Sequence, residues 1–215
     1  MKIEVIADGP YEVTGGPPLH PKRILRSEQD EALTWRAGPE QPQDETYYLC
    51  RCGHSRDKPF CDGSHAFELF DGDETASVDR FDDRREEHAG TGITVLKDGE
   101  LCQHAQFCVN AATNWFELIA ETADTSRRAQ LIAMIEHCPS GALVFEIDDE
   151  RIEPSLAAEI APVEDGPLFV SGGIPIERAD GEPIETRNRV VLCRCGGSQN
   201  KPLCDGSHID NGFRS

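Results

Sequence analysis

The chain has 215 residues, a formal net charge of -19 and a hydrophobic content of 38%. The excess of acidic residues argues against nucleic acids and anionic membranes as partners, because both are themselves polyanions. The modest apolar content favours small modules stabilised by bound metal over one large core. No apolar run approaches the roughly 20 residues that span a bilayer, and no apolar segment of a signal peptide is visible, so we expect a cytoplasmic protein.

The first segment that indicates β structure is DGPYEVTGG at 8–16, where Tyr11 and Val13 alternate between turn residues. The polar stretch at 23–43 predicts an inserted surface loop or a short helix. A further strand is expected in ETYYLC, which runs directly into a cysteine. Residues 1–73, here called the first module, are therefore expected to be a small, mostly β unit.

Residues 50–65 read CRCGHSRDKPFCDGSH, and almost the same pattern, CRCGGSQNKPLCDGSH, returns at 193–208. In each copy, a glycine should permit the tight turn, and the preceding aspartate should accept backbone N–H bonds. Cysteine and histidine clustered this closely in a reducing compartment indicate metal sites rather than disulfides. The candidate ligands are Cys50, Cys52, Cys61 and His65, and then Cys193, Cys195, Cys204 and His208.

The stretch at 68–87 carries nine acidic residues and three arginines with almost no apolar period, which predicts a solvated linker; we place it at 74–91. Residues 92–148, here called the middle domain, begin with ITVLKDGELC, which predicts a strand and a turn. TSRRAQLIAMIEHCP predicts a helix that is capped near 124–126 and ends before Pro139. GALVFEID predicts a second strand.

The last part of the chain, residues 149–215, repeats the first module and is called the second module. Its start, at 148–164, has two prolines and six acidic residues and indicates a second linker. DGPLFVSGG at 165–173 then matches 8–16, and NRVVLC predicts a strand that enters the second cysteine motif. The sequence thus predicts an α+β protein: two β-rich modules paired about a pseudo-twofold axis, plus a small α+β insert.

The full spacing of the repeated motif, C-x-C-x2-S-x3-P-x-C-D-G-S-H, resembles the CDGSH iron–sulfur family. The resemblance implies that each motif binds a 2Fe–2S cluster through three cysteines and one histidine. It also implies that the Cys-x-Cys pair holds the inner iron and that the Cys–His pair holds the outer, more exposed iron. Three cysteines and one histidine are equally a proper set of zinc ligands, so zinc is the alternative.

A histidine ligand has two chemical consequences. Replacing one thiolate by a neutral imidazole removes a negative charge, which raises the reduction potential above that of an all-cysteine cluster. The imidazole also has an ordinary pKa of about 6.5, so protons compete with iron for its nitrogen and the cluster should be acid-labile.

The three remaining cysteines, Cys102, Cys108 and Cys138, lie in the middle domain. CQHAQFCV and HCPSGALVF resemble the divergent single-cluster ferredoxin family, although Ala105 stands where a further cysteine is expected. Three visible cysteines predict a 3Fe–4S cluster. The alternative is a 4Fe–4S cluster with a non-cysteine fourth ligand, for which His104 is the nearest candidate.

No nucleotide-binding glycine-rich loop, no G-x-S-x-G and no catalytic pair is visible, so we do not expect an enzyme. The sequence predicts a three-cluster protein that transfers single electrons, as a monomer containing an internal pseudo-dimer. Two alternatives are storage of clusters or their transfer to apo-proteins, and a zinc-stabilised interaction module. The expected partner is a redox protein or an apo-protein acceptor with a basic docking face.

Overall fold

The computed structural model describes residues 1–215, with most of the regular structure in short strands. The sheet of the first module has the order β12-β1-β2-β5. Buried and partly exposed side chains alternate along β1 and β2, as expected for half-buried strands. The strands predicted at 8–16 and 45–50 are confirmed. The bounds are β1 (Lys2–Val5), β2 (Tyr11–Thr14), β5 (Thr46–Leu49) and β12 (Ile176–Glu177).

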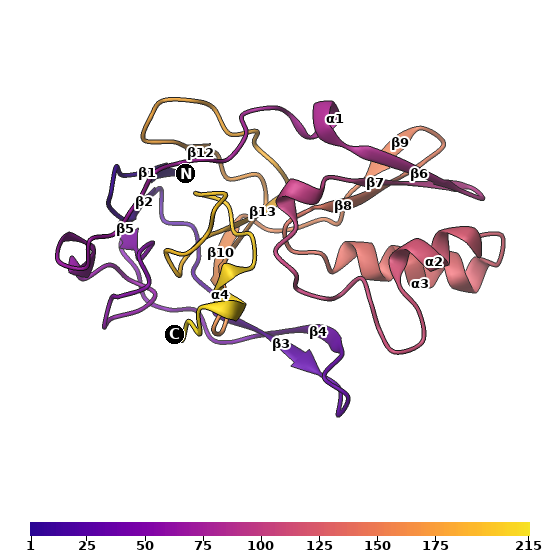
Figure 1. The fold of residues 1–215 in the computed structure, drawn as a ribbon, viewed down its shortest axis with the longest axis horizontal. Helices are drawn as coiled ribbons and strands as arrows, with labels where there is room; N and C mark the ends of the chain where they lie inside the picture. Colours follow the sequence, from indigo (N-terminus) through magenta and orange to yellow (C-terminus); the bar gives the residue numbers. More distant parts are fainter.

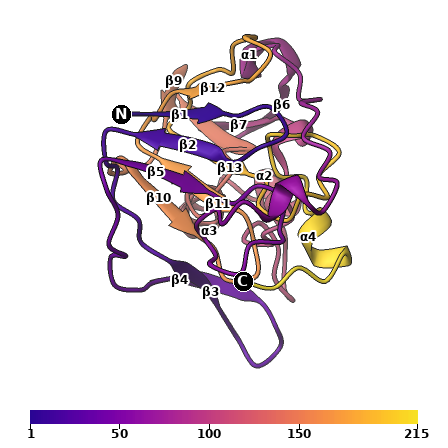
Figure 2. The ribbon, with the colours of Figure 1, turned by 90° about the vertical axis from the view of Figure 1, so that its left-hand side faces the viewer.

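The second module repeats this arrangement as a three-stranded sheet, β10-β11-β13, which lies beside the first (Figure 2). Strands β11 and β13 are buried along their whole length. One face, with Leu168 and Leu192, joins the core shared with the first module, while Phe169 on the other face packs against Trp35. The bounds are β10 (Glu159–Pro162), β11 (Leu168–Ser171) and β13 (Arg189–Leu192).

The two modules exchange backbone contacts at equivalent positions. The N–H of Ile3 donates to the carbonyl of Pro175 at 2.9 Å, and the N–H of Ile160 donates to the carbonyl of Pro18 at 2.9 Å. The strand pairing is also exchanged, because β1 pairs with Ile176 and β10 pairs with the chain at Leu19. Contacts that occur twice with the roles reversed are the pattern of an isologous interface. The pseudo-twofold axis itself stays a prediction.

The inserted segment of the first module is a β-hairpin, not the predicted loop or short helix. Strands β3 (Lys22–Arg26) and β4 (Ala32–Ala37) pair only with each other. The hairpin lies below the second module and beside the middle domain (Figure 1). The ring of Trp35 explains its position: it lies 4.9 Å from the ring of Phe107 and 5.8 Å from that of Phe169. Packing against the middle domain and the second module thus stabilises the hairpin, whose own strands contain few apolar residues.

The middle domain is a two-layer α+β unit, with its sheet over two helices (Figure 1). The predicted helix and both predicted strands are confirmed, and the Asp124 carboxylate caps the helix by accepting from the N–H of Ser126 at 2.7 Å. The helix α2 and the edge strands were not predicted. The bounds are β6 (Glu86–Gly90), β7 (Ile93–Lys97), η2 (Gly99–Leu101), α2 (Trp115–Ala120), α3 (Thr125–Glu136), β8 (Leu143–Ile147) and β9 (Glu150–Ile152).

Both predicted linkers take part in the fold. The acidic segment contains a short helix, α1 (Phe81–Arg84), whose Phe81 side chain is fully buried in the shared core, and β6 begins inside this segment at Glu86. The second predicted linker contains β9 and β10, and Ile160 is fully buried. The acid-rich composition of both segments thus concealed a few apolar anchors, and the domain boundaries given above stay a prediction. No helix in the chain is long and apolar enough to cross a membrane.

Candidate metal centres

Each repeated motif brings its four predicted ligands together as two pairs. The Sγ atoms of Cys50 and Cys52 are 3.7 Å apart, and Cys61 Sγ is 3.4 Å from His65 Nδ1. Two ligands bonded to one tetrahedral metal at about 2.0–2.3 Å lie about 3.4–3.8 Å apart. Each pair is therefore spaced to hold one metal atom. The corresponding separations in the second module are 3.8 Å for Cys193 and Cys195 and 3.4 Å for Cys204 and His208.

The division into pairs bears on the choice between zinc and an iron–sulfur cluster. A single zinc ion would need all four ligands of a motif around one point. No three histidine, cysteine, aspartate or glutamate side chains in the chain converge in that way. A binuclear cluster instead takes two protein ligands on each iron, and thiolate and imidazole are suitable donors. The arrangement of the ligands therefore fits a 2Fe–2S cluster in each motif.

The Asp-Gly-Ser turn supports the Cys–His pair. Asp62 Oδ1 accepts from the N–H of Ser64 at 3.0 Å, and Asp62 Oδ2 accepts from the N–H of Arg56 at 2.9 Å. These hydrogen bonds, the one from Arg56 first, hold the pKa of Asp62 well below its usual range. Gly63 has a φ of 86°, which favours glycine. The histidines lie in the short helical turns η1 (Ser64–Ala66) and α4 (Ser207–Asp210).

The arginine inside each Cys-x-Cys pair is a supporting residue that the sequence analysis did not single out. Arg51 donates from Nε to the carbonyl of Gly9 at 2.9 Å and from Nη2 to that of Ile6 at 2.9 Å. Arg194 makes the equivalent bonds to Gly166 at 3.0 Å and to Val163 at 2.6 Å. Both guanidinium groups are buried. Each arginine thus fixes the ligand loop to the Asp-Gly-Pro turn of its own module. The repetition of this arginine in both CRCG segments was the sequence signal that could have indicated its role.

The two Cys–His pairs differ in exposure. Cys61 and His65 are partly exposed, as the family resemblance implied for an outer pair. In the second module, Cys204 is 1% exposed and His208 is 9% exposed. Burial, and then the charge of Arg194, lower the pKa of His208. The expectation of an exposed outer pair is therefore wrong for the second module.

The middle domain covers the second motif. A Cβ atom on Gly206 would lie 2.9 Å from His104 Cδ2 and 3.3 Å from the carbonyl oxygen of Gln103. The side-chain amide of Asn200 donates to the carbonyl of Glu100 at 2.8 Å. At the equivalent position in the first module, a Cβ on Gly63 would meet nothing within 4 Å. The segment 100–104, which contains Cys102, thus packs onto the second ligand motif and leaves the Asp-Gly-Ser turn of the first motif uncovered.

The three middle cysteines line one cavity of about 170 Å³. Cys102 and Cys108 come from the loop after η2, and Cys138 follows α3. Burial raises the pKa of Cys102, and it raises that of Cys108 to about 11, so these thiols keep their protons unless a metal displaces them. The cysteines share a cavity without converging on one ion, which fits a polynuclear cluster. His104 also lines this cavity.

The inserted hairpin covers the loop that carries Cys108. The Trp35 indole N–H donates to the carbonyl of His137 at 3.4 Å. Glu31 Oε1 accepts from the N–H of Ala111 at 2.6 Å, and Arg26 donates to the side chain of Gln106 at 3.2 Å. The first module therefore contacts the middle site through its hairpin, which the sequence did not predict.

Comparison with known families agrees with this division of the chain. A family described as "Iron-binding zinc finger CDGSH type" matches residues 8–66 and 165–209. A second family, described as "Divergent 4Fe-4S mono-cluster", matches residues 88–147 between them. No curated protein matches the chain.

Proposed function

We propose that this chain, a CDGSH-type iron–sulfur protein whose two CDGSH regions flank a divergent mono-cluster ferredoxin-like region, transfers single electrons to and from a partner protein. Bound iron–sulfur clusters supply one-electron redox chemistry. One observation carries the proposal: the three ligand sites form a continuous series of contacts. The middle loop touches the second motif at Gly206, and the second motif touches the first at Cys195.

The contact between the terminal motifs is direct. Cys52 and Cys195 pair as an isolated antiparallel bridge, and each is a ligand. Residues opposite each other in such a bridge have Cα atoms about 4.5–5.5 Å apart, so the two terminal clusters should lie within about 20 Å of each other. Pulsed EPR of the reduced protein measures this separation, and a much longer distance would contradict the proposed series.

The proposed cofactors are two 2Fe–2S clusters and one cluster in the middle cavity. The three cysteines of that cavity match a 3Fe–4S cluster, whereas the family description supports a 4Fe–4S cluster, with His104 as the candidate fourth ligand. The protein would then contain about seven or eight irons per chain. Iron analysis with Mössbauer spectroscopy tests both the content and the nuclearity, and equimolar zinc at these sites without visible absorption would overturn the proposal.

The docking face that we propose lies beside the first motif. Phe67 and Leu69 follow His65 and are 87% and 95% exposed. Two acidic residues, Glu68 and Asp71, lie within two positions of them in the sequence. Apolar anchors with a charged rim are typical of protein interfaces, and an acidic rim steers a basic partner. Replacing Phe67 by Ser should weaken docking, whereas replacing Phe116, an exposed ring of the middle domain, should not.

The proposed series of sites is tested by removing the middle cluster, which stands at one end of it. Cys138→Ser should remove the middle cluster and leave the spectra of both terminal clusters intact, because none of their ligands changes. Electron delivery from a reductase to an acceptor should then slow by more than the fractional loss of iron. Delivery at the wild-type rate would show that the middle site takes no part in that transfer.

A second candidate function is the donation of clusters to apo-proteins. The observation in its favour is the partial exposure of Cys61 and His65, the ligands through which a cluster could leave. Mixing the loaded protein with an apo-acceptor separates the two functions. If the acceptor gains a cluster faster than a redox partner gains an electron, cluster transfer is the principal activity.

A further inference from the structure

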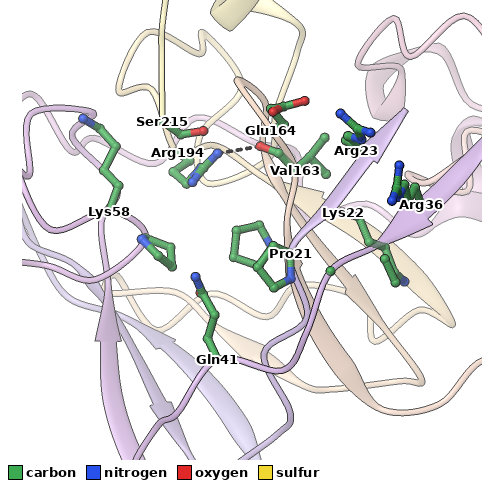
Figure 3. A pocket seen from close by; sticks show the side chains of 14 residues that line it. Pro21, Lys22, Arg23, Arg36, Gln41, Lys58, Val163, Glu164, Arg194 and Ser215 are labelled. Carbon is green, nitrogen blue, oxygen red and sulfur yellow. Dashed lines mark hydrogen bonds between the residues drawn. The ribbon is translucent and has the colours of Figure 1, made fainter. Parts of the chain in front are cut away.

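A cavity of about 520 Å³ lies between the two modules and the inserted hairpin, and none of the candidate metal ligands lines it. Five basic side chains and one acidic side chain line it, in a chain where acidic residues outnumber basic ones by 40 to 21. A volume of this size accommodates a small molecule. The charged side chains are Lys22, Arg23, Arg36, Lys58, Arg194 and Glu164 (Figure 3).

Four of the five basic groups have no carboxylate partner. Lys22 is paired with Glu159 at 2.5 Å. Lys58 donates to the carbonyl of Ser55, and Arg194 donates only to carbonyls. Arg23 and Arg36 make neither a salt bridge nor a side-chain hydrogen bond.

Arg23 and Arg36 also lie directly opposite each other in the hairpin. Directly opposite residues in an antiparallel pair place their side chains on the same face, where like charges are destabilising. Both arginines line the cavity on one side, and Lys58 lies on the opposite side (Figure 3). An anion placed between the two guanidinium groups would remove this repulsion. A bound negative ligand should therefore stabilise the hairpin.

We propose that this cavity binds a small molecule carrying at least two phosphate groups. Arginine presents a planar fork of donors that matches phosphate, and a tetrahedral phosphate offers oxygens in several directions at once, whereas a carboxylate offers two in one plane. One phosphate would lie between Arg23 and Arg36, and the other would extend towards Lys58 and Arg194, on the opposite side of the cavity.

The site would connect its ligand to both terminal motifs. Lys58 lies inside the first ligand loop, next to Pro59, whose carbonyl accepts from the N–H of Cys50 at 2.8 Å. Arg194 stands between the ligands Cys193 and Cys195. A bound anion would add negative charge beside both loops, which disfavours the gain of an electron. We therefore expect the reduction potentials of the terminal clusters to fall when the site is filled.

The test uses the iron-loaded full chain and inorganic pyrophosphate as the probe. Isothermal titration calorimetry at low ionic strength should show one site per chain, with binding weakened by about tenfold or more in Arg23→Gln/Arg36→Gln, because charge-assisted bonds to phosphate are lost. The matched control is Arg80→Gln/Arg127→Gln, which removes two exposed arginines that have their own carboxylate partners. This control should bind within about twofold of the wild type.

Three outcomes would overturn the proposal. The first is no binding of pyrophosphate by the wild type, and the second is equal binding by the Arg23→Gln/Arg36→Gln variant. The third is tighter binding of citrate or of a polyglutamate peptide than of pyrophosphate, which would assign the cavity to carboxylates or to an acidic protein segment. The melting temperature of the double variant distinguishes misfolding from loss of the site. It should equal or exceed that of the wild type, because the repulsion between Arg23 and Arg36 is relieved.

Discussion

The first and second modules carry the same ligands in the same loops, yet their metal centres lie in different surroundings. The ligand spacings agree within 0.1 Å, and the arginine inside each Cys-x-Cys pair makes the same carbonyl contacts. His65 is nevertheless partly exposed, whereas His208 is buried beneath the loop that contains His104. Duplication thus preserved the site, and the inserted middle domain changed the access of solvent to one copy.

This difference suggests a division of work between the modules. The first module presents its Cys–His pair near an exposed apolar patch, and the second presents the same pair to the middle domain. In the proposed function, the first motif exchanges electrons with the partner protein, and the second motif connects the first motif to the middle site. The predictions below are ordered from the largest expected effect to the smallest.

The largest effect should follow from separating the modules. A Cβ on Gly53 would lie 2.7 Å from the carbonyl oxygen of Cys195, and a Cβ on Gly196 would lie 2.6 Å from that of Cys52. Backbone atoms cannot move aside, and both glycines have positive φ, so each alanine should cost about 3–5 kcal/mol of unfolding free energy. Chemical denaturation of the two variants measures this cost. Clearly unequal costs would contradict a reciprocal interface.

Acid should distinguish the two terminal clusters. His65 is accessible to protons, whereas burial lowers the pKa of His208, so protonating His208 costs more. The neutral His208 ring therefore stabilises the fold above a pH of about 6.5, and this contribution is lost as the pH falls below that value. Visible absorption at pH 5 should therefore decay in two phases, and the cluster of the first module should decay faster.

Histidine variants assign those phases. His65→Cys should abolish the fast phase, because a thiolate stays bound where an imidazole is protonated, and it should lower the potential of that cluster. His208→Cys should affect the slow phase alone. A fast phase that survives in His65→Cys would show that His65 is not the labile ligand.

A matched pair of glycines measures the contact with the middle domain. Gly63 and Gly206 have φ values of 86° and 95°, so alanine should add backbone strain of about 1–2 kcal/mol at either position. Only at Gly206 would the new methyl group meet His104. Gly206→Ala should therefore cost about 1–3 kcal/mol more than Gly63→Ala and alter the EPR signal of the middle cluster. Equal losses of unfolding free energy in the two variants would mean that the contact between Gly206 and His104 contributes little to stability.

The smallest effect concerns a hydroxyl present in the first module alone. Tyr11 donates to the carbonyls of Cys193 at 2.8 Å and Pro202 at 3.1 Å, whereas the equivalent residue of the second module is Leu168. Tyr11→Phe should cost about 1–2 kcal/mol, because a buried hydrogen bond to the second ligand loop is lost. Thermal unfolding of the loaded protein measures this, and Tyr47→Phe, which loses a bond to Pro17 within the first module, is the control.

Local patterns predicted the elements whose apolar residues are close in sequence. Helix α3 was predicted by its cap near 124–126 and by the proline that follows it, and strands β5 and β13 by apolar runs that enter a cysteine. The hairpin β3–β4 and strand β10 were not predicted. Their stability comes from residues far along the chain, namely Phe107 and Phe169 against Trp35, and the first module against Ile160.

The sequence by itself determined the identity of all eleven candidate ligands, because cysteine and histidine at fixed spacings define a metal site through local backbone geometry. Only the tertiary structure decided which motif is covered, which cations gather around one cavity, and how the three sites are arranged relative to one another. These properties depend on residues tens to more than a hundred positions apart that the fold brings together, such as His104 against Gly206, and Arg36, Lys58 and Arg194 around one cavity. The two motifs share their ligand spacing and differ at four other positions, one of which, Asn200, contacts the middle domain. The shared spacing alone therefore carries no signal of the different neighbours.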